Sequence, residues 1–104
     1  MKVIRDLSEM IEDTIECAEK YISTAIEWKD EYPEVAKALA TVSEGEMASV
    51  GVLHTAVAKV IAEYRKANGE PPEPMMAVSN YLHEKHISNA ARVKAMQAMY
   101  KEDK

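Results

Sequence analysis

The sequence predicts an all-α protein, an antiparallel bundle of three long helices, and three observations lead to that prediction. Apolar residues recur at the spacing of an α-helix in every segment between the Pro breaks. The breaks are few, since the four Pro of the chain fall in two short stretches. No alternating run of β-branched residues predicts a strand.

The first helix is expected over residues 3–29 and the second over residues 33–68. Pro33 suits the first turn of a helix, where its missing N–H costs nothing. Asn68-Gly69 is typical of a helix stop of the left-handed type. At a rise of ~1.5 Å per residue, the second helix is about 50 Å long.

The third helix is expected over residues 74–102. Pro71, Pro72 and Pro74 form a short rigid connection before it, and Pro74 can open the helix. This helix and the first are each about 40 Å long. Because short connections make neighbouring helices antiparallel, the three are expected to run up, down and up.

The bulk properties place the chain among globular proteins and exclude several partners. A length of 104 residues predicts one domain, residues 1–104. The net charge of -5, with no basic stripe, argues against nucleic acid as a partner. No stretch approaches the ~18 unbroken apolar residues of a membrane span. The single cysteine, Cys17, excludes an internal disulfide framework, and with no signal-peptide core we expect a cytoplasmic protein.

Helical wheels at about 100° per residue predict one buried face for each helix. For the first helix these residues are Ile4, Leu7, Ile11, Thr14, Ala18, Tyr21, Ile22 and Ala25. For the second they are Val35, Leu39, Val42, Ser43, Glu46, Val50, Leu53, Val57, Ile61 and Tyr64. For the third they are Met75, Val78, Leu82, His86, Asn89, Val93, Met96 and Tyr100.

The second helix has an additional strip of small and apolar residues beside its buried face. The strip consists of Ala36, Ala40, Met47, Gly51, His54, Ala58 and Ala62. A helix that is apolar on two sides usually contacts partners on both. Gly51 inside a helix costs about 1 kcal/mol relative to Ala, which a close neighbouring helix would explain. We therefore expect a homodimer; the alternative is that the first and third helices cover both strips within one chain.

Polar residues interrupt the predicted core of all three helices, where a plain bundle would carry aliphatic side chains. They are Thr14, Ser43, Glu46, Ser49, His86 and Asn89. A buried carboxylate or imidazole is costly unless it is paired, hydrogen-bonded or bound to a metal. These residues are therefore either the remains of a site or a site in use.

Glu46 has three interpretations: its side chain reaches water, it pairs with His86 or a Lys, or it binds a metal. A carboxylate and an imidazole on facing helices suit iron, manganese or zinc. His86 is central in its stripe, although a lone core histidine is more often hydrogen-bonded than a ligand. His54 fits an interface residue better than a ligand, and His83 points off the stripe, so His83-x-x-His86 is a weak metal motif. Thr14 can bond its own helix backbone.

Three segments resemble the ferritin-like, rubrerythrin-type di-iron proteins, in particular a small phage- or prophage-type branch. Residues 13–21 resemble the first helix of that family. Residues 33–49 resemble its second helix, which carries a Glu-x-x-His pair, and residues 82–100 resemble a later helix with a second such pair. The resemblance implies a ferritin-like fold, completed in this short chain by dimerisation.

The ligand positions that the resemblance implies are mostly changed in this chain. The Glu of the first helix falls on Thr14, and the His of the second-helix pair falls on Ser49. The later pair falls on His86 and Asn89, and Glu46 alone is retained. Thr and Ser are poor iron ligands and Asn is a weaker one than Glu, so the resemblance implies a degenerate di-iron site.

The first functional hypothesis is a structural or interaction protein whose di-iron site has been replaced by a hydrogen-bonded polar core. Such a protein needs no cofactor and is expected not to be an enzyme. The alternative is a mononuclear metal-binding or redox protein that uses Glu46 and His86, with His54 across an interface. Expected partners are a second copy and another protein, without nucleic acid or membrane.

Overall fold

The computed structural model describes residues 1–102 and confirms the prediction of an all-helical chain. Helix α1 spans Lys2–Trp28, α2 spans Pro33–Asn68 and α3 spans Glu73–Glu102. Each helix begins and ends within one residue of the predicted bounds. Gly69 ends α2 with a φ of 80°, a conformation that glycine tolerates, and its N–H donates to the Arg65 carbonyl at 2.9 Å.

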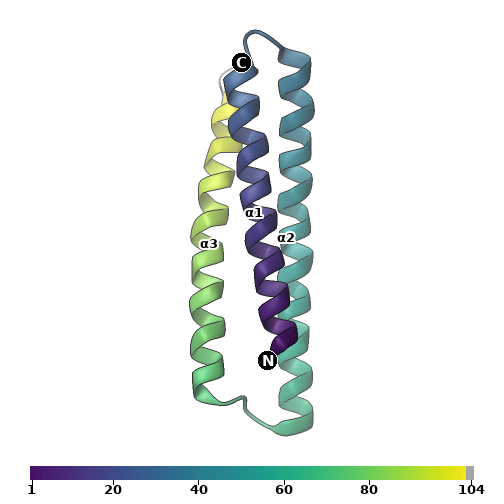
Figure 1. Ribbon diagram of the computed structural model, residues 1–104, viewed down its shortest axis with the longest axis vertical. Helices are drawn as coiled ribbons and strands as arrows, with labels where there is room; N and C mark the ends of the chain where they lie inside the picture. Colours follow the sequence, from purple (N-terminus) through teal and green to yellow (C-terminus); the bar gives the residue numbers. More distant parts are fainter. Residues whose placement is uncertain (103–104) are drawn as a thin grey trace.

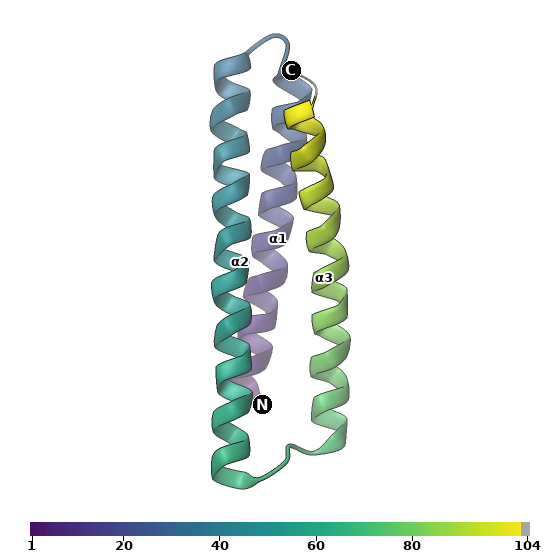
Figure 2. The ribbon, with the colours of Figure 1, turned by 180° about the vertical axis from the view of Figure 1, so that it is seen from behind.

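The three helices run side by side along a slender body with extents of 56 × 18 × 17 Å (Figure 1). Neighbours in sequence are antiparallel, and α2 and α3 continue past the start of α1. Helix α1 packs against both others, whereas α2 and α3 touch each other at few places. In Figure 2, α1 lies behind α2 and α3 and between them. No helix in residues 1–102 is long and apolar enough to cross a bilayer.

The core follows a repeat of seven residues rather than the repeat of a straight helix. In α1 the buried residues alternate in steps of four and three: Ile4, Ser8, Ile11, Ile15, Ala18, Ile22 and Ala25. In α2 they are Ala36, Ala40, Ser43 and Val50, and in α3 they are His86, Val93 and Tyr100. Long helices that wind around each other keep this repeat, because it holds one seam against the partner.

Several residues that the sequence predicted to be buried are exposed. Tyr21, Val35, Val42 and Val78 have exposed fractions of 37–60%, whereas Ile15, absent from the prediction, is 2% exposed. The physical reason is that a wheel at about 100° per residue drifts by ~20° per heptad from the repeat of packed helices. Over helices this long, the predicted stripe moves away from the true seam.

The additional strip of α2 is buried at one end and exposed farther along the helix. Ala36 and Ala40 belong to the core of the chain, so α1 and α3 cover part of the strip, as the alternative had it. Gly51 and Ala58 are exposed. A methyl group at Gly51 would meet no atom within 4 Å, so no other helix of the described chain passes close to it. A close helix of a second copy at Gly51 stays a prediction.

Candidate functional site

A buried hydroxyl joins all three helices in the part of the bundle nearer the α1–α2 connection. Ser43 of α2 is 0% exposed, and its hydroxyl donates to the Ala18 carbonyl of α1 at 2.7 Å. Gln97 of α3 donates from Nε2 to the same hydroxyl at 3.0 Å. Sequence analysis placed Ser43 in the core but did not identify Gln97, which is polar in a largely apolar row of α3. This junction is a hydrogen-bonded polar core that needs no ligand.

Two other polar positions are satisfied within their own helices. The Thr14 hydroxyl donates to the Met10 carbonyl at 2.7 Å, as predicted for a half-buried helical Thr. The Ser49 hydroxyl donates to the Gly45 carbonyl at 3.2 Å. Ser49 is exposed, so its predicted place in the buried stripe is wrong. Both hydroxyls donate to their own helix, as polar helical side chains commonly do.

The structure does not bring Glu46 beside His86. Glu44 of α2 forms an ion pair with Lys101 of α3 at 2.9 Å, so the Glu44 side of α2 faces α3. Two residues further on, about 160° around the helix, Glu46 faces away from α3 and therefore from His86. Its side chain is half-buried, and it has no hydrogen bond or ion pair within residues 1–102. The interpretation in which Glu46 reaches water therefore agrees best with the structure.

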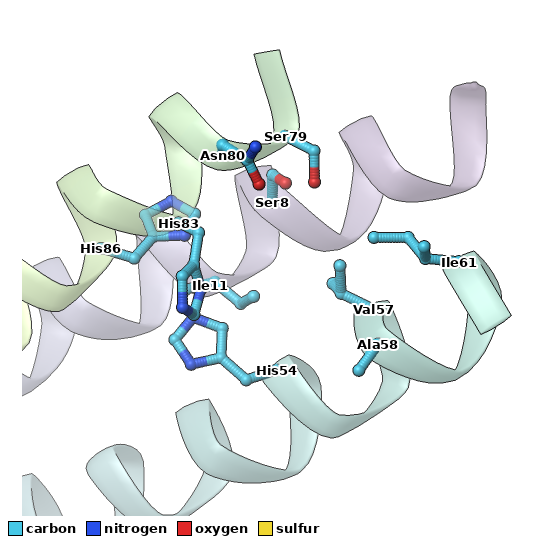
Figure 3. A pocket seen from close by; sticks show the side chains of 10 residues that line it. All are labelled: Ser8, Ile11, His54, Val57, Ala58, Ile61, Ser79, Asn80, His83 and His86. Atoms are coloured by element: carbon cyan, nitrogen blue, oxygen red, sulfur yellow. The ribbon is translucent and has the colours of Figure 1, made fainter. Parts of the chain in front are cut away.

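Three histidine rings gather between α2 and α3 (Figure 3). The ring centres of His54 and His83 are 5.3 Å apart, and those of His54 and His86 are 5.9 Å apart. His86 is 2% exposed, His54 is half-buried and His83 is exposed. Sequence analysis assigned His54 to an interface and His83 to the outside. The signal for the cluster was the His83-x-x-His86 spacing, because residues three apart on a helix are neighbours.

The histidine cluster lines a small cavity of about 210 Å³. Its polar lining also includes Ser8 of α1 and Ser79 and Asn80 of α3. The Nε2 atoms of both His54 and His86 are buried and have no hydrogen-bond partner within the described chain. Buried polar atoms are nearly always paired, so two unpaired ring nitrogens at one cavity call for an explanation.

The environment of His54 and His86 favours neutral imidazoles. Burial lowers the pKa of His86 below its ordinary value of 6.5, and the charge of His54 lowers it further. Burial likewise lowers the pKa of His54, with a smaller contribution from His83. A neutral imidazole has one ring nitrogen that can accept a hydrogen bond or bind a metal.

The residues at the family's ligand positions do not fit a di-iron centre. Thr14 and Ser49 bond their own helices, and Glu46 faces away from His86. Asn89 is half-buried and does not line the histidine cavity. Within residues 1–102, no group of three His, Cys, Asp or Glu side chains is arranged to hold a metal ion as it stands.

A row of exposed apolar side chains covers the side of α1 and α2 that faces away from α3; we term it the outer face. It comprises Val3, Met10, Tyr21, Trp28, Val35 and Val42. Helix α1 turns Glu12 and Glu19 toward α3, where they pair with Lys85 and Arg92.

The spacing of these residues places them opposite α3. Met10 lies two residues before Glu12, and Tyr21 lies two residues after Glu19, about 160° around α1. Val42 lies two residues before Glu44 on α2, so it also faces away from α3. Both helices therefore present apolar residues on one side of the bundle. Nothing in residues 1–102 covers this side, although Tyr21, Val35 and Val42 were predicted to lie in the core.

The comparisons with known proteins add no assignment. No protein-family model, curated protein or solved structure matches this chain. The case for a function therefore rests on the polar junction, the histidine cluster and the outer face.

Proposed function

We propose that the protein is a structural or interaction protein, a ferritin-like bundle that has lost its di-iron site and acts by self-association. The loss is supported at the ligand positions, where Thr14 and Ser49 bond helix carbonyls and Glu46 has no partner in the described chain. The packing of three helices is supported by the Ser43 junction, which links α1, α2 and α3 with neutral hydrogen bonds.

The outer face is the observation that carries the proposal. Its six side chains have exposed fractions of 37–53%. With side-chain surfaces of roughly 150–250 Å² for the larger members, they expose about 500 Å² of apolar surface. The largest apolar patch on a typical monomer is about this size and often serves as an interaction site. Two such faces together would bury about 1,000 Å², the lower limit for a specific interface.

The partner that we propose is a second copy of the chain. Helices α1 and α2 are antiparallel to each other, and both run along the long axis of the molecule. A two-fold axis can therefore bring the same face of two copies together. The two α1–α2 layers then form a four-helix core, with each α3 on the outside. Glu46 lies four residues after Val42 on the same face, so association would remove its carboxylate from water.

A charge in the outer face tests this interface. Val42→Glu places a carboxylate in the proposed contact, and it should convert the dimer to a monomer while the helix content is unchanged. Val52→Glu is the matched control, because Val52 lies on α2 outside the outer face and is 70% exposed. Sedimentation velocity at equal concentrations measures both variants. The proposal is contradicted if the two variants sediment alike.

The proposal also includes the cellular compartment of the protein and its chemical activity. Cys17 is an exposed thiol without a disulfide, which suits a reducing compartment such as the cytoplasm. We do not propose a mononuclear site of Glu46 and His86, because Glu46 faces away from α3, the helix that carries His86. We propose no catalytic activity for the chain.

A further inference from the structure

We propose that His54, His83 and His86 bind one divalent transition-metal ion within a single chain. The proposal is independent of the outer face, because the three residues lie between α2 and α3. It uses a ligand set that differs from the family's Glu-x-x-His pairs, since all three donors are imidazoles. It rests on the positions of the rings and on the unpaired nitrogens at their cavity.

The separations of the His54 ring from the other two rings are close to those around a shared ion. Zn–N bonds of about 2.0–2.1 Å at tetrahedral angles place the centres of two ligating imidazoles roughly 5 Å apart. The ring centre of His54 lies 5.3 Å from that of His83 and 5.9 Å from that of His86. The rings of His54 and His86 are now stacked at 28°, so binding requires them to turn. A histidine ring turns about its Cβ–Cγ bond, whose torsion is broad.

The unpaired nitrogens give the binding a physical cause. Nε2 of His54 and Nε2 of His86 are buried with no partner in the described residues. A metal ion would pair both at once, and exposed His83 can close over it from the preceding turn of α3. Ser8 and Asn80 at the cavity wall can hold a water in the remaining position. Imidazole donors suit zinc, copper and nickel, and three nitrogen ligands with one open position are typical of zinc.

Titration of untagged protein with Zn²⁺ tests the proposal. Isothermal titration calorimetry should show one ion per chain, and Co²⁺ in its place should give the visible absorption of a four-coordinate site. His83→Gln should weaken binding at least tenfold, and His54→Gln should do the same. His83 is the sharper test, because it is exposed and its replacement leaves the core intact. Circular dichroism verifies that each variant is folded.

Two further variants decide between this site and its competitors. Ser79→Ala removes a hydroxyl from the wall of the same cavity without touching a proposed ligand, and Glu46→Gln removes the carboxylate that the sequence suggested as a ligand. Both should bind Zn²⁺ as the unaltered chain does. The proposal is overturned by absence of binding, by binding that His83→Gln leaves unchanged, or by binding that Glu46→Gln abolishes. A ratio of one ion to two chains would also overturn it, because the three ligands belong to one chain.

Discussion

Replacing Ser43 by Ala should lower the free energy of unfolding by about 1–2 kcal/mol. The variant loses two neutral hydrogen bonds, one to the Ala18 carbonyl and one from Gln97, each of about 1 kcal/mol. The Ala18 carbonyl keeps a helical partner, and Gln97 is half-buried, so neither group becomes a fully buried orphan. Ala has a better helix propensity than Ser, which offsets roughly 0.5 kcal/mol of this loss. The Tm should fall by roughly 5–15 °C for a domain of this size.

Ser49→Ala is the matched control for this prediction. It makes the same change in the same helix, but the Ser49 hydroxyl is exposed and bonds only the Gly45 carbonyl of its own helix. Urea denaturation followed by circular dichroism, at one protein concentration, gives the free energy of unfolding of both variants. If Ser43→Ala and Ser49→Ala are equally stable, the Ser43 junction does not hold the helices together and the reasoning fails.

Three other predictions follow from the same structure. Because burial holds the pKa of His54 and His86 below 6.5, the unfolded chain takes up protons first as the pH falls. The free energy of unfolding should therefore decrease as the pH is lowered through 6.5, and it should level off once the folded chain is protonated too. Urea titrations without metal measure this effect, and the absence of any decrease would contradict the prediction. Gly51→Ala should raise the free energy of unfolding by about 0.5–1 kcal/mol, because the site is open and Ala favours the helix. A loss of stability in thermal denaturation would instead show that a neighbour packs against Gly51. Glu46→Gln should tighten self-association about tenfold, ~1.4 kcal/mol, because a charged carboxylate no longer has to leave water when two chains associate. A sedimentation dilution series measures the association, and a weaker one would show that the carboxylate is paired across the interface.

The ends of the helices could be predicted because their signals are local. Pro33 fixes the first turn of α2, and Gly69 takes the positive φ that ends it. These residues act on their own backbone, so the sequence alone identifies them. The buried face depends on how the helices wind around each other, which no single helix encodes. Val42 was therefore placed in the core although it lies on the outer face.

The histidine cluster depended on the register between two helices. His83 and His86 are close in sequence, and their spacing was visible as a weak motif. His54 joins them only because α2 and α3 are antiparallel and meet at that height. The same register brings Gln97 to Ser43. Sequence analysis could name the polar residues, but it could not say which of them meet.

The central claim is that two copies of the chain associate through the outer face. Sedimentation equilibrium of untagged, metal-free protein over a range of concentrations tests it most directly. One chain has a mass of 11.6 kDa. The account predicts that the measured mass approaches twice this value at high concentration. On dilution the mass should fall to that of one chain. A mass of 11.6 kDa at every concentration would contradict the claim.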